Sequence, residues 1–233
     1  GPILRVGIAQ PDMDPYEKWG AGDTPMDKLR NLTALYDSIA AIAKPDLILW
    51  PETAVPFYLL QPTYRDEWHW LRNHIDSTGV ALLTGFPDLK WYEGDAPAGA
   101  RKLQDGSASY QSFNSSILIQ PFFEPQIYHK SRLTPMSERI PYLDVIPGLQ
   151  NMLTWGVGIS NWGLGNDTTV FSFRTRTLGA RTWAMICYET LYPSFVSGFA
   201  ARGAGFFGVI TNDGWFGNSS GPYQLQQYTV LRA

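Results

Sequence analysis

Apolar residues recur along this chain in two alternating patterns. Short runs of β-branched and large apolar residues, bounded by Pro, Gly or charged residues, predict buried strands. Segments with apolar residues three and four apart predict amphipathic helices. The strands are expected at 3–10, 46–50, 80–86, 112–120, 126–130, 168–173, 182–187 and 205–211. The helices are expected at 24–43, 64–77 and 192–202, and from Pro222 onward; the first presents Leu29, Leu32, Leu35, Ile39 and Ile42.

The order of these elements favours a layered α/β fold in a single domain over residues 1–233. Residues 87–111 are rich in Gly, Ala and Asp and predict a polar loop between two strands. Residues 131–166 are rich in Pro, Gly, Asn and Trp and show no clean period. A connection of that length in a compact domain is usually a lid or a binding loop, so we expect a lid-like excursion there.

Composition narrows the possible partners. The 233 residues are 44% hydrophobic and carry a net charge of -3, with Lys and Arg scattered along the chain, so no basic stripe predicts nucleic-acid binding. No apolar run approaches the roughly 18 residues of a membrane span, and we find no charged-then-apolar leader pattern at the amino terminus. One cysteine and three histidines without zinc spacing predict no disulfide, no metal and no cofactor.

Three segments put a reactive side chain at the end of an apolar strand. They deliver Glu52, Lys130 and Cys187. Carboxyl ends of strands are where α/β folds assemble their sites, so a carboxylate, an ammonium and a thiol can converge. Moving a proton from thiol to carboxylate costs about 5 to 6 kcal/mol in water. We expect burial to raise the Glu52 pKa, and Lys130 with the following helix start to lower the Cys187 pKa.

Each residue also has an ordinary structural interpretation. A lone buried cysteine is usually a small packing residue, and Glu52 and Lys130 taken singly suit a turn cap and a solvated charge. His69 and His74 lie in a helical stretch where structural roles are more common than ligation. Only the three segments taken together, in this order, favour nucleophilic catalysis by Cys187. Lys130 and backbone N–H groups around Tyr188 would then stabilise the oxyanion of the intermediate.

The ordered set Pro-Glu, His-Lys and Cys-Tyr-Glu resembles the nitrilase, or carbon-nitrogen hydrolase, superfamily. The resemblance implies a four-layer αββα sandwich with a Glu, Lys, Cys triad. Longer segments resemble one branch, the apolipoprotein N-acyltransferase family, and together they cover essentially the whole chain. These segments are 49–56, 128–141 and 211–217, with Lys18-Trp19 and Leu231-Arg232-Ala233 also fitting.

The resemblance assigns roles to individual positions. It implies Glu52 as general base, Lys130 as electrostatic stabiliser and Cys187 as nucleophile. Supporting residues of the triad are implied at Glu138, Tyr188, Glu189 and Asn114. Trp19 and Trp215 match positions that shape the acyl and lipid site, although both also suit plain packing.

The implied reaction moves a fatty acyl chain from a phospholipid, through a Cys187 thioester, to the α-amino group of a diacylglyceryl-cysteine at an apolipoprotein amino terminus. It implies a membrane surface as partner and a bacterial inner membrane location, with this domain on the periplasmic side. The apolar residues of the excursion, Met152, Leu153, Trp155 and Trp162, suit a lid that meets lipid tails.

Two departures from the family pattern leave alternatives open. Family members carry membrane-embedded segments that this chain lacks, and their sandwich continues with strands beyond residue 233, so we expect a truncated domain. A soluble amidase or nitrilase with water as acceptor is the first alternative. A non-catalytic or inactive truncated domain is the second.

Overall fold

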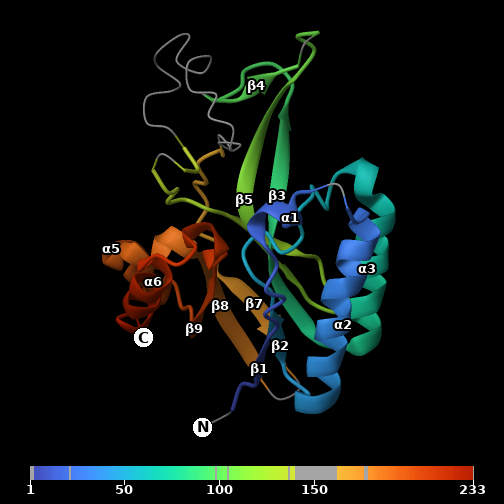
Figure 1. Cartoon of the computed structure of the whole chain (residues 1–233), viewed down its shortest axis with the longest axis vertical. Helices are drawn as coiled ribbons and strands as arrows, with labels where there is room; N and C mark the ends of the chain where they lie inside the picture. The colour runs from blue at the N-terminus through green and yellow to red at the C-terminus, as the bar shows by residue number, and fades with distance from the viewer. Residues whose placement is uncertain are drawn as a thin grey trace.

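The structure is a computed structural model, and the ribbon is drawn in Figure 1. It describes residues 3–20, 22–97, 99–103, 105–135, 137–139, 162–175 and 178–232. The strands are β1 Val6–Ile8, β2 Leu47–Leu49, β3 Ala81–Tyr92, β4 Arg101–Lys102, β5 Ser109–Ile119, β6 Gln126–His129, β7 Phe171–Arg174, β8 Gly179–Ile186 and β9 Phe206–Ile210. The α-helices are α1 Pro15–Lys18, α2 Pro25–Ala43, α3 Arg65–Thr78, α5 Pro193–Ala201 and α6 Gly221–Val230, with 3-10 helices η1 Pro62–Tyr64, η2 Cys187–Leu191 and η3 Asp213–Phe216.

Two sheets form the middle of the molecule. The first has the order β1-β2-β3-β5-β4, with β6 also paired to β5, and the second has the order β7-β8-β9. In the first sheet β1, β2 and β3 are parallel, whereas β5 is antiparallel to β3, β4 and β6. Figure 1 shows α2 and α3 on the outer side of the first sheet and α5 and α6 beside the second. The four-layer αββα sandwich expected from the sequence is confirmed.

The outer helix layer packs through one face of α2, as the periodicity predicts. Thr24 caps this helix, because its hydroxyl accepts from the Asp27 N–H, and Pro25 follows as the first helical residue. Leu29, Leu32 and Tyr36 are buried against α3 and the first sheet. The expected face was wrong at Leu35 and Ile42, which are exposed, because Tyr36 fills the buried position one turn after Leu32.

The core between the sheets comes from alternate residues of both. Leu47, Leu49 and Leu83 of the first sheet belong to the same buried cluster as Ala184 and Ile186 of β8. The other face of β2, β3 and β5 faces the α2 and α3 layer instead. Both faces of these strands are therefore buried, which explains why their sequences are continuously apolar.

The prediction of a polar loop over 87–111 was wrong at both ends, because strands occupy the first and last residues of that range. Strand β3 continues to Tyr92 and β5 already begins at Ser109, and their ladder runs from Leu82↔Ile119 to Tyr92↔Ser109. Backbone hydrogen bonds hold this antiparallel hairpin where its side chains are polar, so hydrophobicity alone underestimated its length. Figure 1 shows the hairpin extending beyond the helical layers toward β4.

The two described ends of the expected excursion lie against the first sheet. Trp162 donates its N–H to the carbonyl of Glu138, and Gly163 donates to Ser112. Met152, Leu153 and Trp155 lie outside the described residues, so the lid stays a prediction. Among the described helices, none combines the length and the apolar character that a membrane crossing requires.

Candidate active site

Glu52 lies in the turn that follows β2, and the chain there is held close to β3. Gly85 N–H donates to the Pro51 carbonyl, and Val55 N–H donates to the Gly85 carbonyl. A Cβ on Gly85 would lie 2.3 Å from the Thr53 nitrogen, so only glycine permits this approach. Thr53 has a φ of 47°, a backbone conformation that is costly outside glycine and that clusters at functional sites.

Four side chains meet beside this turn and form what we call the Lys130 cluster: Glu52, Asn114, Lys130 and Glu138. Lys130 Nζ lies 3.2 Å from Glu52 Oε1 and 2.8 Å from Glu138 Oε2. The Asn114 amide donates to Glu52 and to Glu138, at 2.7 Å each. Glu52, Asn114 and Lys130 are less than a tenth exposed. The structure therefore brings together two of the three expected triad residues and two of their expected supporting residues.

Lys130 and Glu138 hold each other in the ionised state. Burial by itself would lower the Lys130 pKa, but the carboxylates of Glu52 and Glu138 outweigh it and raise that pKa. Burial would raise the Glu138 pKa, but the Lys130 ammonium and hydrogen bonds from Thr134 and Asn114 lower it overall. Lys130 is thus a fixed positive charge beside two carboxylates.

Cys187 comes directly after β8, at the start of η2, and is buried. Its φ of 49° makes it the second non-glycine residue of the site with a strained backbone, in the sharp strand-to-helix turn that exposes nucleophiles in many enzymes. The Glu189 carboxylate accepts from Ile186 N–H, and the Thr190 hydroxyl donates to the Cys187 carbonyl. These bonds keep the turn in place.

The expectation of a lowered Cys187 pKa was wrong. Burial raises the pKa of the thiol to about 12, the Glu52 carboxylate adds to this, and Lys130 and a hydrogen bond with Thr211 only partly oppose it. The Glu138 carboxylate adds a smaller increase, so burial and the two carboxylates together outweigh the single ammonium. A thiolate becomes favourable there only if a carboxylate takes its proton, because the total charge then stays constant.

Glu189 is a structural carboxylate that joins the two halves of the site. It accepts from the Tyr128 hydroxyl and the Ser131 N–H on one side, and from Ile186 N–H on the other. It is fully buried, and burial raises its pKa to about 7 against these hydrogen bonds. Glu189 therefore ties the chain after Lys130 to the turn that carries Cys187.

A second cluster of charged side chains lies next to the first and was not predicted from the sequence. It consists of Asp88, His129 and Asp167, and we call it the His129 cluster. His129 Nδ1 lies 2.7 Å from Asp167 Oδ2, and Nε2 lies 2.9 Å from Asp88 Oδ2. Both partners are carboxylates, so both ring nitrogens donate and the ring is an imidazolium. Burial lowers the His129 pKa, but the bonds to Asp167 and Asp88 outweigh it and raise the pKa overall.

Two further contacts to Glu52 were also missed. Buried Lys18 donates to the Glu52 carbonyl at 2.9 Å and to the Thr53 hydroxyl at 2.6 Å. The Asn212 N–H donates to Glu52 Oε2 at 3.2 Å. Both residues lie in segments that carried the family resemblance, which was the only signal in the sequence for their position.

The aromatic residues expected at the lipid site lie at the surface. Trp19 is 44% exposed and Trp215 is 48% exposed. Trp19 stands next to Lys18, whose ammonium lies 5.9 Å from the indole ring. Tyr188 follows the nucleophile, and its ring packs edge-on against Tyr192 at 5.6 Å. Among the described residues, His, Cys, Asp and Glu form no group of three or more that could hold a metal ion.

This geometry can be compared with known proteins. The family model for carbon-nitrogen hydrolases matches residues 5–233. The chain belongs to the carbon-nitrogen hydrolase family. Its fold agrees with solved members at low identity: yeast Nit3, of the nitrilase superfamily, gives a TM-score of 0.61 at 12% identity over 98% of this chain and 70% of that one. The NitN amidase of Nesterenkonia gives 0.55 at 18% identity over 90% of this chain and 67% of that one.

Curated relatives within this family point to one branch. The apolipoprotein N-acyltransferase of Chlorobaculum tepidum is 40% identical over 99% of the chain, and that of Bdellovibrio bacteriovorus is 33% identical over 84%. The chain spans 43% and 34% of the lengths of these two relatives. This carbon-nitrogen hydrolase domain is therefore similar in sequence to part of larger proteins named apolipoprotein N-acyltransferase.

Proposed function

We propose that this carbon-nitrogen hydrolase domain transfers a fatty acyl chain from a phospholipid to the α-amino group of an apolipoprotein whose first residue is a diacylglyceryl-cysteine. The observation that carries the proposal is the 40% identity over 99% of the chain to a protein named apolipoprotein N-acyltransferase. The Lys130 cluster beside Cys187 supports it, because a thiol, a base and a fixed cation are what acyl transfer through a thioester requires.

In the first half-reaction Cys187 Sγ attacks the ester carbonyl of the donor, and Glu52 accepts the thiol proton. The oxyanion of the tetrahedral intermediate is stabilised by the Lys130 ammonium and by backbone N–H groups around Tyr188. The carbon–oxygen bond then breaks, and Glu52 returns its proton to the leaving glycerol oxygen. The products are a lysophospholipid and an acyl thioester on Cys187.

In the second half-reaction the α-amino group of the acceptor attacks the thioester carbonyl. Glu52 takes a proton from the attacking amine, the carbon–sulfur bond breaks, and the sulfur recovers a proton from Glu52. An amide forms and the thiol is regenerated. Asn114 and Asn212 both donate to the Glu52 carboxylate, so they would hold this base in one orientation through both steps.

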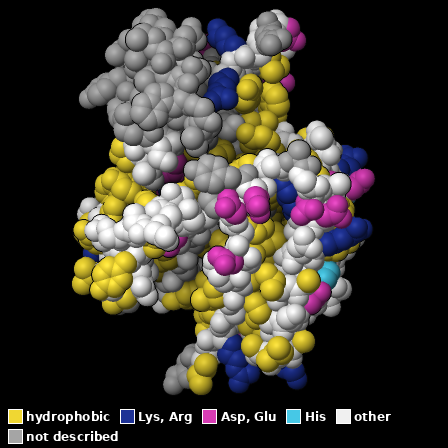
Figure 2. Space-filling model, in the orientation of Figure 1, with side chains coloured by type: hydrophobic (Ala, Val, Ile, Leu, Met, Phe, Trp, Pro, Cys, Tyr) yellow, Lys and Arg dark blue, Asp and Glu magenta, His cyan; other side chains and the backbone are white. Residues whose placement is uncertain are grey.

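We place this chemistry at the inner membrane, on the periplasmic side, in keeping with the location that the family resemblance implies. Exposed aromatic side chains support a membrane-facing surface, because Trp and Tyr suit the lipid–water interface. Figure 2 shows hydrophobic side chains gathered at the edge formed by α5 and α6. The exposed aromatics of η3 and α6 are Trp215, Phe216, Tyr223 and Tyr228.

The test is to incubate the domain with phosphatidylethanolamine in mixed micelles and to follow its intact mass. We expect an increase of one acyl chain that hydroxylamine removes and that Cys187→Ala lacks. Addition of a diacylglyceryl-cysteine peptide should discharge the adduct and yield acylated peptide. The control variant is Trp91→Phe, in the last part of β3, which should acquire the same acyl adduct as the wild type. It controls for losses in handling and for non-covalent adsorption of lipid.

Three other outcomes of this experiment would each favour a different function for the domain. Turnover of small amides without a lipid adduct would assign the domain to the hydrolases of the family. A discharge that gives free fatty acid in the presence of the peptide would make water the acceptor. Neither adduct nor turnover, with the fold intact by circular dichroism, would indicate an inactive domain.

A further inference from the structure

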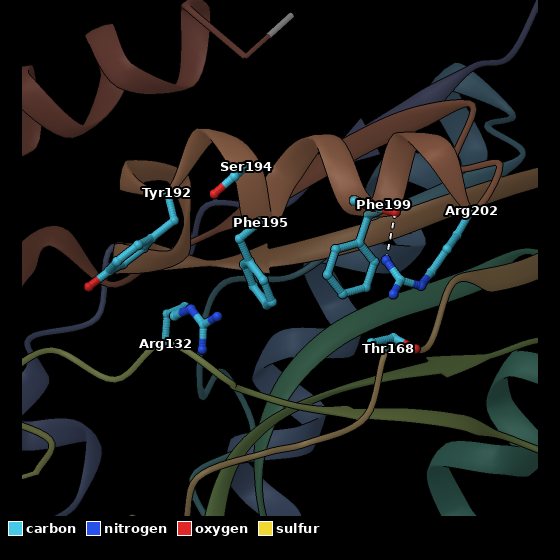
Figure 3. Close-up of a pocket in the computed structure, with 8 residues that line it drawn as sticks. Arg132, Thr168, Tyr192, Ser194, Phe195, Phe199 and Arg202 are labelled. Atoms are coloured by element: carbon cyan, nitrogen blue, oxygen red, sulfur yellow. Dashed lines mark hydrogen bonds between the residues drawn. The ribbon is translucent and has the colours of Figure 1, made fainter.

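A groove of about 290 Å³ lies along α5, outside the Lys130 cluster, and its polar groups point to an anion (Figure 3). Two guanidinium groups, three hydroxyl groups and three aromatic rings line it, with no acidic side chain among the lining residues. They are Arg132, Thr168, Tyr192, Ser194, Phe195, Gly198, Phe199 and Arg202. A positive groove is unusual on a chain whose net charge is -3.

The two guanidinium groups are oriented but not neutralised. Arg132 lies over Phe195 at 4.5 Å, and its side chain donates to the Ser131 carbonyl at 3.3 Å. Arg202 donates to the Gly198 carbonyl at 2.8 Å. Among the described residues neither has a carboxylate within ion-pair distance. Within the described part of the chain, most N–H groups of both have no acceptor, and a guanidinium fork matches the oxygens of a phosphate.

The groove shares a wall with the candidate active site. Arg132 follows Lys130 by two residues, and its backbone N–H donates to Glu189, which also bonds the turn carrying Cys187. Tyr192 packs its ring against Tyr188, the residue after the nucleophile. A molecule with an anionic group in the groove can therefore extend toward Cys187.

We propose that this groove binds the phosphodiester headgroup of the phospholipid donor while the ester of the same molecule reaches Cys187. The inference rests on the proposed function. In a glycerophospholipid the phosphate and the esters share one three-carbon glycerol, so the two subsites must be neighbours. The volume is just below the roughly 300–1,000 Å³ of sites for drug-sized ligands, which suits a headgroup. Its two arginines and three hydroxyl groups favour a phosphodiester over the acyl chains.

The test compares two donors that carry the same esters, phosphatidylethanolamine and the matching diacylglycerol, in mixed micelles. Acylation of Cys187 is followed by intact mass in the wild type and in the Arg132→Gln/Arg202→Gln variant. We expect the variant to lose about tenfold in kcat/KM with phosphatidylethanolamine, mainly through KM, and to be unchanged with diacylglycerol. The matched control is Arg174→Gln, since Arg174 also lies over an aromatic ring, Phe123, at 5.8 Å. The control should behave as the wild type with both donors.

Equal losses with both donors would overturn the proposal, because the arginines would then act on the turn and not on the phosphate. No loss with either donor would overturn it as well. If the wild type forms no adduct at all, the proposed function fails separately. The groove is then judged by amide NMR shifts of Ser194 and Gly198 on adding glycerophosphoethanolamine or inorganic phosphate. No shift, or equal affinity for inorganic phosphate alone, contradicts a headgroup site.

Discussion

His129 and Lys130 are neighbours in the chain, and each places a cation between two carboxylates. Lys130 lies between Glu52 and Glu138, and His129 lies between Asp88 and Asp167. Successive side chains of an extended segment point to opposite sides, so the two clusters do not mix. The Lys130 cluster faces the nucleophile. The His129 cluster includes Asp167, which follows the expected excursion at once. In the last part of that excursion the Gly165 N–H donates to the Lys130 carbonyl.

The comparison shows that carboxylate partners decide the charge of a buried cation. The pKa of Lys130 and that of His129 are raised despite burial, because each has two carboxylates. Lys18 is a third buried cation, and among the described residues its ammonium donates hydrogen bonds to a carbonyl and a hydroxyl but to no carboxylate. Burial therefore lowers its pKa to about 8 in spite of Glu52. Of the two paired cations, only His129 can change its charge near neutral pH.

The largest expected effect comes from Lys130→Met. The change removes the cation facing Cys187 and leaves Glu52 and Glu138 buried without their shared partner. We expect acylation of Cys187 to fall at least about 1,000-fold, as for loss of an oxyanion stabiliser. We also expect the free energy of unfolding to fall by about 3–5 kcal/mol. Intact mass and urea unfolding measure the two losses, with Lys102→Met on β4 as control. Retention of more than a tenth of the rate contradicts the assigned role.

Glu138→Gln sharpens the comparison within the Lys130 cluster. Its carboxylate accepts from Lys130, Asn114 and the Thr134 N–H, and a neutral amide must turn its NH₂ toward one of these donors. We expect Lys130 to shift and the acylation rate to fall about hundredfold, as for small displacements of catalytic groups. The Cys187 pKa should fall in this variant, because one nearby negative charge is lost. Iodoacetamide alkylation between pH 6 and 10 measures it; an unchanged profile contradicts the charge argument.

How much of this site could be predicted from sequence depends on the kind of contact. Glu52 and Lys130 follow apolar strands and carry the family motif, so their convergence was predicted and is confirmed by the geometry. The His129 cluster was not predicted, because Asp88 stands in a segment interpreted as a polar loop and Asp167 stands between the expected excursion and the next expected strand. Nothing local in a sequence marks two aspartates as partners of a histidine 41 and 38 residues away.

The fold shows the same division between local and distant causes. Helix α2 and the buried strands follow from periodicity and capping, which are properties of neighbouring residues. The long β3–β5 hairpin follows from a ladder between residues far apart, such as Tyr92 and Ser109. The Cys187 pKa was mispredicted for a similar reason, because the burial that raises it most comes from packing between segments far apart in the chain.

His129→Asn should separate the two clusters by pH. The folded-state pKa of His129 is raised, so its stabilisation is complete below the unfolded value of about 6.5 and is lost as pH rises through the folded value. Asp88 and Asp167 favour the imidazolium, and Lys90 opposes it. We expect the variant to lose about 3 kcal/mol of unfolding free energy at pH 6 and less at pH 8.5. Acylation should fall about tenfold at pH 6, through displacement of the Lys130 backbone.

The control for this pH effect is His74→Gln, because His74 forms a histidine–aspartate pair with Asp37 on α2 and α3, away from both clusters. Its loss should not reduce the acylation rate at either pH. A loss in His129→Asn that is equal at pH 6 and pH 8.5 would mean that the ring acts by packing alone. Direct titration of the His129 ring by NMR should show a midpoint above 6.5.

The smallest expected effect concerns Lys18, the buried cation without a carboxylate pair. Its folded-state pKa is about 8, below the unfolded value of about 10.4. Between these values the unfolded chain binds more protons, so the stability of the wild type should rise with pH from 8 to 10.5. Lys18→Met should remove this rise. The loss of two hydrogen bonds should lower the free energy of unfolding by about 1–2 kcal/mol at pH 7. The acylation rate should change by less than about threefold. Urea midpoints measured across this range, with Lys44→Met as control, test it. A parallel pH dependence in wild type and variant would show that Lys18 stays charged without a carboxylate, and the rule drawn from Lys130 and His129 would then fail.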